Sequence, residues 1–261
     1  TADILDLIEA SKLDWSDIDP SILGTLFERG LDPDKRSQLG AHYTDRDKIM
    51  MIVRPVIVEP LLAEWATVKT QIEAELAKAA GTTGATKTKA TNEANRLRIA
   101  FMERLTAFRV LDPACGSGNF LYLALLELKN LEHRVNLECE ALGLPREFPR
   151  IGPEAVLGIE LNPYAAELAR VSVWIGEIQW MRRNGFEAAR DPILRKLDTI
   201  QNCNAIIDPA GNPVVWPSAD AIVGNPPYLG AKLMKRKLGV DETEGIRAIY
   251  ADRLPGFTDL V

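Results

Sequence analysis

Three short apolar runs, each ending at a polar or glycine-containing motif, constrain the fold of this chain more than any other feature of its sequence. The runs cover residues 108–112, 155–160 and 220–223, and a weaker candidate lies near Thr199-Ile200. Helical apolar patterns follow the first two runs, and this alternation predicts an α/β fold with a doubly wound, Rossmann-like parallel sheet. Ligands bind beyond the carboxyl ends of the strands in such sheets, so we expect the three motifs to form one site.

The chain before the first run is expected to be mostly helical. Apolar residues recur there at three- and four-residue steps, both before and after the stretch 81–89. That stretch has no apolar residue larger than alanine, and we predict an exposed, mobile connection. The sequence thus divides into a helical region, residues 1–106, and an α/β region, residues 107–261.

Composition narrows the class of protein. The chain has 261 residues, of which 46% are hydrophobic, so it can bury a sizeable core. No apolar run reaches the length of about eighteen residues that a membrane span needs. The three cysteines are widely and irregularly spaced, which favours a reducing cytoplasm over a disulfide framework. Neither His42 nor His133 pairs with a cysteine at metal-ligand spacing, so we expect no metal site.

The first motif, Asp112-Pro-Ala-Cys-Gly-Ser-Gly-Asn-Phe-Leu121, follows the first predicted strand. Gly116 and Gly118 let the backbone turn tightly and approach a ligand without a clash from a Cβ atom. A dinucleotide-binding loop needs a third glycine three residues further on, where this chain has Leu121. We therefore expect a cofactor without phosphates, such as a nucleoside that carries an amino acid.

Glu160 closes the second predicted strand, and Asn162-Pro163 behind it predicts the capped start of a helix. A carboxylate in this position can accept hydrogen bonds from both hydroxyls of a ribose. The alternative is an ordinary acid at a helix N-terminus, favoured by the helix dipole. The glycine loop on the preceding strand favours the ribose contact.

The third motif, Asn225-Pro-Pro-Tyr228, directly follows the last predicted strand. Its prolines fix φ and remove two donors, so that the Asn225 side-chain oxygen and the Pro226 carbonyl can both accept from one amino group. Two acceptors stabilise the positive charge that develops when a delocalised nitrogen attacks a methyl group. Tyr228 offers a flat face for a flipped base. The alternative is a simple loop after a strand, since Pro-Pro pairs commonly mark loops.

These motifs together resemble those of the amino-group DNA methyltransferases, specifically the N6-adenine type. The glycine loop and Gly158-Ile-Glu160 resemble their two cofactor motifs, and Asn225-Pro-Pro-Tyr228 resembles their catalytic motif. Gly40-Ala-His-Tyr-Thr44 resembles the motif that precedes the first one and lines the methionine end of the cofactor, although His42-Tyr43 alone would be interpreted as a surface turn. This order resembles the gamma arrangement, in which the target-recognition domain comes last.

The resemblance implies a class I methyltransferase sheet with S-adenosyl-L-methionine as cofactor. Residues 1–106 would be an N-terminal helical region carrying the Tyr-Thr motif, and residues 107–261 the first half of the catalytic domain. The implied catalytic residues are Asn225, Pro226, Pro227 and Tyr228. The implied cofactor-binding residues are His42, Tyr43, Thr44, Asp112, Ala114, Gly116, Gly118, Asn119, Phe120, Glu160, Leu161 and Asn204.

More narrowly, Thr25-Leu-Phe-Glu-Arg29 and Tyr228-Leu-Gly-Ala-Lys232 resemble large single-chain type II restriction–modification enzymes of the MmeI-like kind. The implied partner is double-stranded DNA. A net charge of −6 counts against extensive duplex contact by this chain alone, so we expect DNA recognition mainly in a domain outside it.

The sequence departs from that family in two places. Asn204 stands where the family has an Asp that contacts the adenine ring of the cofactor, and its side-chain oxygen remains an acceptor. The sheet stops after its fourth strand, whereas a full methyltransferase sheet has seven. Such a piece would expose an unpaired hydrophobic edge, and we expect it to be unstable or inactive in isolation.

Three other functions fit parts of the pattern. A protein glutamine methyltransferase also uses Asn-Pro-Pro-Tyr on a delocalised nitrogen, but the Tyr-Thr motif and the long helical region argue against it. A non-catalytic methyltransferase-fold scaffold would be expected to have lost Gly116, Gly118, Glu160 or Asn225. A nicotinamide oxidoreductase leaves the missing third glycine and the Asn-Pro-Pro-Tyr motif unexplained.

Overall fold

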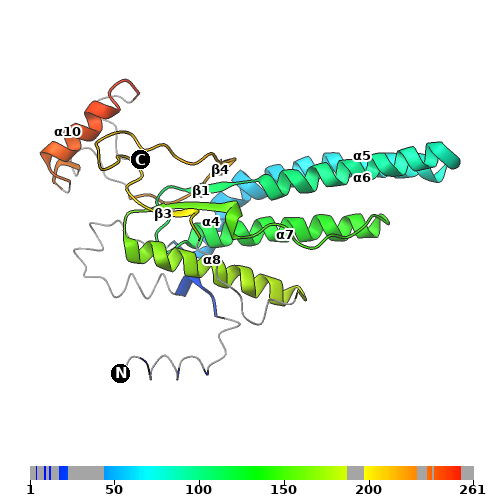
Figure 1. The fold of residues 1–261 in the computed structure, drawn as a ribbon, viewed down its shortest axis with the longest axis horizontal. Helices are drawn as coiled ribbons and strands as arrows, with labels where there is room; N and C mark the ends of the chain where they lie inside the picture. The colour runs from blue at the N-terminus through cyan, green and yellow to red at the C-terminus, as the bar shows by residue number, and fades with distance from the viewer. Residues whose placement is uncertain are drawn as a thin grey trace.

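The computed structural model describes residues 4, 9, 12, 18–22, 44–186, 197–227, 234–236 and 238–253, the side chain of Glu242 excepted. At its centre lies a four-stranded parallel sheet in the order β3-β2-β1-β4 (Figure 1). The strands are β1 (Val110–Asp112), β2 (Val156–Glu160), β3 (Ile200–Asn202) and β4 (Ala221–Ile222). Every predicted run contains one of these strands, and the order confirms the predicted Rossmann-like α/β sheet.

Two long helices form crossovers between neighbouring strands. Helix α7 (Asn119–Ala141) leads from β1 towards β2, which a short 3-10 turn (Pro153–Ala155) precedes. Helix α8 (Pro163–Arg183) leads from β2 towards β3 and packs against α7. The side chain of Asn162 caps α8 by accepting from the backbone N–H groups of Tyr164 and Ala165, as predicted.

The two faces of the sheet are covered differently. Side chains alternate along a strand, so Val110 of β1 and Val156 of β2 face the main core, which α7 and α8 share. The alternate residues of the same two strands face the opposite side of the sheet. There Leu111, Leu157 and Ile159 form a separate buried cluster. No helix of the described residues covers this second cluster; Cys203, Ala205 and Ala219, from the irregular segment between β3 and β4, pack against it instead.

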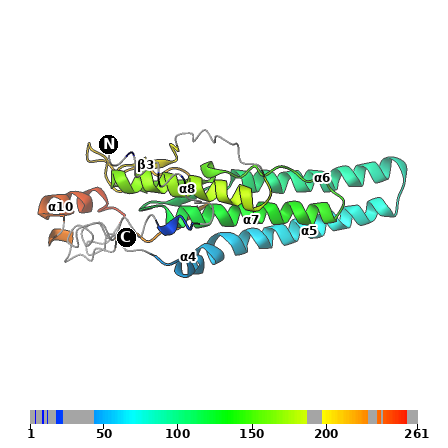
Figure 2. The same cartoon turned by 90° about the horizontal axis from the view of Figure 1, so that it is seen from below.

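The N-terminal region forms a long helical hairpin. Helix α4 (Arg46–Val53) continues through a π-helical segment (Arg54–Val58) into α5 (Glu59–Ala80), and α6 (Gly84–Ala107) returns beside it. The π-helical segment contains Pro55, whose missing N–H interrupts the regular helical ladder. Figures 1 and 2 show the hairpin extending well past the sheet, with α10 (Val240–Ile249) at the opposite end of the molecule.

The predicted mobile connection at 81–89 is wrong over most of its length, because α6 begins at Gly84. Alanine and lysine are good helix formers, so a stretch without large apolar residues can still continue a helix against a neighbour. The contact is made by small side chains: Ala79 of α5 and Ala90 and Ala94 of α6 are buried. Only the turn at residues 81–83 separates the two helices.

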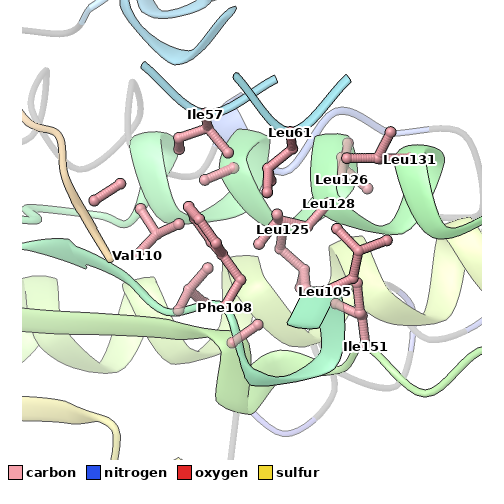
Figure 3. Packing of buried hydrophobic residues seen from close by; sticks show 14 of the residues in the cluster. Ile57, Leu61, Leu105, Phe108, Val110, Leu125, Leu126, Leu128, Leu131 and Ile151 are labelled. Atoms are coloured by element: carbon pink, nitrogen blue, oxygen red, sulfur yellow. The ribbon is translucent and has the colours of Figure 1, made fainter. Parts of the chain in front are cut away.

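The helical hairpin and the sheet share one hydrophobic core. Figure 3 shows Ile57 and Leu61 facing Leu125 and Leu128 of α7, with Leu105 of α6 nearby. Trp65 is also buried; its ring lies 5.1 Å from that of Phe101, and its Nε1 donates to Glu138 Oε2 at 2.9 Å. Within the described part of the chain, no helix is both long and apolar enough to cross a membrane.

Gly118 allows the glycine loop to lie directly against α8. Its φ is +86°, and a Cβ atom there would lie 2.8 Å from Ala169 Cα. We therefore expect Gly118→Ala to destabilise the full-length protein. Gly143→Ala is a matched control, because Gly143 also has a positive φ of +78° but no atom from the described part of the chain within 4 Å of the place of a Cβ.

Both variants carry the backbone strain of a side chain at positive φ, but only Gly118→Ala adds a collision with helix backbone. Overpacking of this kind costs about 2 kcal/mol beyond the control. The measurement is the thermal unfolding midpoint of each variant. Equal midpoints for the two variants would contradict the packing role of Gly118.

Candidate cofactor and catalytic site

The carboxyl ends of β1, β2 and β4 meet at one edge of the sheet. Asp112 ends β1 beside Gly158 of β2, and Leu111 lies beside Ile222, the last residue of β4. The glycine loop follows β1, Glu160 is the last residue of β2, and the Asn225 motif follows β4. The structure therefore brings the three predicted motifs to the same edge.

Glu160 is held in place by backbone donors on both of its oxygens. Gly116 N–H donates to Oε2 at 2.8 Å, and Asn162 N–H donates to Oε1 at 2.7 Å. The first bond joins the end of β2 to the glycine loop after β1. A carboxylate has about four acceptor positions, so two remain for a ligand. Glu160 therefore fits both interpretations of the sequence. It lies at the N-terminus of a helix, and it keeps acceptor positions for hydroxyl groups.

The two glycines of the loop differ in what surrounds them. Gly116 has a φ of +54°, and no atom of the described residues lies within 4 Å of the place where its Cβ would be. The backbone at Gly116 therefore faces open space that a ligand can enter. At Gly118, helix α8 occupies the space that a side chain would need. This glycine is therefore required for packing against α8, whereas the sequence suggested that it allows a ligand to approach.

Asp112 lies beneath the loop. It is buried, and its Oδ1 accepts from Ala114 N–H at 3.0 Å. Burial is the main cause that raises the pKa of Asp112 to about 7; the charge of Glu160 adds to the rise, and the hydrogen bond from Ala114 opposes it. Gly224, the residue before Asn225, lies so close that a Cβ atom there would overlap Asp112 Oδ1. Asp112 of the first motif is therefore in direct contact with the residue that precedes the third motif.

The Asn225 motif also contacts the N-terminal region. Asn225 is exposed, and its Nδ2 donates to Thr44 Oγ1 at 3.1 Å. Thr44 comes two residues before α4, at the end of the predicted Tyr-Thr motif. Pro226 and Pro227 are partly exposed beside it. Tyr228, His42 and Tyr43 lie outside the described residues, and their roles stay predictions.

A small hollow of about 10 Å³, room for roughly one water-sized group, lies next to Thr44. Asn119, the first residue of α7, lines it, and the Asn119 Oδ1 atom is buried without a hydrogen-bond partner among the described residues. The other lining residues are Asp19, Ser21, Arg46, Ile49, Tyr122 and Leu123. An orphaned buried acceptor costs free energy, so this arrangement suits a ligand that brings a donor.

Asp19, Arg46 and Tyr122 line this hollow although the sequence does not predict them as site residues. No motif or periodicity marks them, since they come from three separate segments that only the fold brings together. Burial raises the pKa of the Tyr122 hydroxyl, the charge of Asp19 raises it as well, and the positive charge of Arg46 opposes the rise. Ile18, next to Asp19, accepts from Gln179 Nε2 of α8 at 2.7 Å, which ties this segment to the sheet region.

The remaining predicted cofactor residues lie in different surroundings. Phe120 is buried in the main core, whereas Leu161 is 61% exposed beside Glu160 and can offer an apolar surface. Asn204 lies after β3, where its Oδ1 accepts from the N–H groups of Ile206 and Ile207 at 2.8 and 3.3 Å. The acceptor expected to contact the cofactor adenine therefore caps its own loop, and its ligand contact stays a prediction.

Comparison with known proteins agrees with this geometry. A parallel sheet with a glycine loop, an acid after β2 and Asn-Pro-Pro after β4 is typical of methyltransferases. Residues 87–253 match the family described as "MmeI, DNA-methyltransferase domain", and the chain belongs to this family. The match covers more than half of the chain, so the resemblance to MmeI-like methyltransferases is confirmed.

Individual relatives are similar over most of the chain. "DNA methyltransferase A" of Bacillus subtilis (strain 168) is 28% identical over 244 residues, which is 88% of this chain and 25% of the relative. A Methanocaldococcus jannaschii protein, whose name describes a type II restriction enzyme and methyltransferase, is 27% identical over 62% of this chain and 14% of its own length.

A solved structure, the type IIL restriction–modification enzyme MmeI in complex with DNA, has a TM-score of 0.67 and 27% identity. The match covers 95% of this chain and 31% of the solved chain. The present chain thus spans about a third or less of the proteins that it matches.

Asp112→Asn is expected to stabilise the full-length protein more at pH 8 than at pH 5.5. The pKa of Asp112 in the folded protein is about 7, compared with an ordinary value of 3.8. Between pH 3.8 and pH 7, Asp112 therefore takes up a proton when the protein folds. Wild-type stability therefore falls as pH rises through this window. Asparagine keeps the acceptor for Ala114 N–H but does not titrate.

The measurement is the difference in unfolding midpoint between variant and wild type at the two pH values. Asp208→Asn is the control, because hydrogen bonds from Asn212 hold the pKa of partly exposed Asp208 below its usual range. Its difference should be the same at both pH values. A pH-independent difference for Asp112→Asn would contradict the raised pKa.

Proposed function

We propose that this chain is the cofactor-binding and catalytic part of a restriction–modification enzyme that transfers a methyl group from S-adenosylmethionine to N6 of a flipped-out adenine in DNA. The observation that carries the proposal is the contact between Asp112 of the first motif and Gly224, the residue before the third motif. Gly224 lies against Asp112, so Asn225 stands at the same sheet edge as Glu160 and the glycine loop. A methyl donor and an amino group bound there would be neighbours.

The residues present suit S-adenosylmethionine. Glu160 has two free acceptor positions for ribose hydroxyls, Leu161 is exposed beside it, and Gly116 faces open space. Asn119, whose buried Oδ1 has no hydrogen-bond partner among the described residues, lines the small hollow near Thr44. The absent third glycine argues against a pyrophosphate. The bound cofactor would supply an electrophilic sulfonium methyl group.

Asn225 and Pro226 would act on the substrate amino group. Because Asn225 Nδ2 donates to Thr44, its Oδ1 remains free to accept from the substrate. Together with the Pro226 carbonyl, it would stabilise the positive charge that develops on the attacking nitrogen. Holding the amine in line with the methyl group supplies further acceleration. No strong base is needed before transfer, since the proton can leave afterwards.

The choice of DNA as substrate is supported by the relatives. Membership of the MmeI methyltransferase family favours DNA over the side-chain amide of a protein, and the solved MmeI structure contains DNA. The net charge of −6 supports a recognition domain elsewhere in the full-length protein. All three cysteines are free, which suits the reducing cytoplasm in which cellular DNA is modified.

Asn225→Ala in the full-length protein tests the proposal. We expect methyl transfer to unmethylated DNA, followed with a labelled cofactor, to fall at least about a hundredfold, because one of two acceptors for the developing charge is lost. Cofactor affinity, measured by isothermal titration, should change less than about threefold, since its net binding contacts remain.

Asn212→Ala provides a control for the substitution itself, because the Asn212 amide donates to Asp208 within its own loop. This variant should transfer methyl groups at the wild-type rate. Transfer by Asn225→Ala at that same rate would refute the catalytic role, and loss of cofactor binding would show that Asn225 shapes the cofactor site instead.

A further inference from the structure

The catalytic role proposed for Asn225 requires one orientation of its side-chain amide. Oδ1 is an acceptor and Nδ2 carries two donors, so the two ends of the amide are not interchangeable. With Oδ1 towards the substrate, the amino group finds an acceptor. With the amide reversed, Nδ2 would meet the substrate amino group, donor against donor. Something must therefore hold the correct orientation.

Thr44 is the described residue that makes such a contact. Its Oγ1 lies 3.1 Å from Asn225 Nδ2 and accepts a hydrogen bond from it. A hydroxyl has two acceptor positions and one proton, so this bond leaves the Thr44 proton free for another acceptor. Thr44 also lines the hollow with Asn119, whose Oδ1 has no partner among the described residues.

Thr44 is fixed by the helix that follows it. The carbonyl of Asp45 accepts from Ile49 N–H at 3.0 Å, and Ile49 is buried in the main core where α4 packs against α7. The chain around Thr44 is therefore anchored independently of the loop that carries Asn225. An anchored acceptor can orient the side chain of a neighbouring, exposed residue.

We propose that Thr44 is a positioning residue that holds the Asn225 amide with its oxygen towards the substrate. The inference rests on the proposed catalytic role of Asn225. It gives Thr44 a different task from the cofactor contact that the sequence suggests. The Thr44 hydroxyl accepts a hydrogen bond from Asn225 and keeps its own proton for a second hydrogen bond. Thr44 thus contacts the catalytic loop and also lines the hollow.

The test compares Thr44→Val and Thr44→Ser in the full-length protein. Valine has nearly the shape of threonine but no acceptor, whereas serine keeps the hydroxyl. With saturating cofactor and unmethylated DNA, we expect the single-turnover rate of methyl transfer to fall about tenfold in Thr44→Val, the worth of one hydrogen bond. Thr44→Ser should stay within about twofold of wild type, since it can make the same bond.

Cofactor affinity separates positioning from binding. Isothermal titration should give affinities within about threefold of wild type for both variants, since the net worth of the cofactor contacts is unchanged. A wild-type rate in Thr44→Val would overturn the proposal. So would a rate loss in Thr44→Val that the serine variant shares, or one explained by weaker cofactor binding.

An Asn225→Asp background provides a second test. The two oxygens of a carboxylate are equivalent acceptors, so aspartate needs no partner to select its orientation. Adding Thr44→Val to Asn225→Asp should therefore lower the rate by less than about twofold, in contrast to the loss in the wild-type background. An equal loss in both backgrounds would show that Thr44 acts on something other than the amide.

The Asn225→Ala variant distinguishes the two proposals. If Asn225→Ala loses transfer while Thr44→Val keeps it, only the positioning role is wrong. If Asn225→Ala keeps transfer, the catalytic role fails and the positioning role fails with it.

Discussion

The carboxylate of Glu160 joins the ends of two neighbouring strands, and the candidate site depends on it. One oxygen accepts from Gly116 in the loop after β1, and the other accepts from Asn162 at the start of α8. The loop, the strand end and the helix start are thereby fixed relative to one another. Charge-assisted hydrogen bonds of this kind are about twice as strong as neutral ones. A ligand that used the remaining acceptors would bind to a prearranged surface.

The neighbouring carboxylate, Asp112, has the opposite environment. It has no access to solvent, it accepts from Ala114, and the backbone of Gly224 closes over it. The two acids thus have different roles at this edge of the sheet. Glu160 is partly exposed and available to a ligand, whereas Asp112 is enclosed and holds the loop and the catalytic motif together.

Local patterns explain how much of this was predictable from the sequence. The four strands, the capped start of α8 and the meeting of three motifs at one edge all follow from apolar runs and the residues at their ends. The helical start of α6 at Gly84 did not follow, because its stability comes from packing of Ala90 and Ala94 against α5. The contact between Thr44 and Asn225 joins residues 181 positions apart, and no short-range pattern encodes it. The neighbour of Gly118, Ala169 on α8, is another contact that only the fold creates.

The irregular cover on the second face of the sheet sets an order in which parts of the molecule open. Long helices protect one face of β1 and β2, but Leu111 and Ile159 are covered on the other by small residues of a loop. Side-chain hydrogen bonds from Trp216 and Tyr250 to backbone carbonyls help to hold that loop. Segments with few apolar contacts open at a lower free energy than the core. Amide hydrogens of β4 and the loop before it should therefore exchange with solvent before those of α7, so the loop that carries Asn225 follows a strand that opens more readily than the helices behind the sheet.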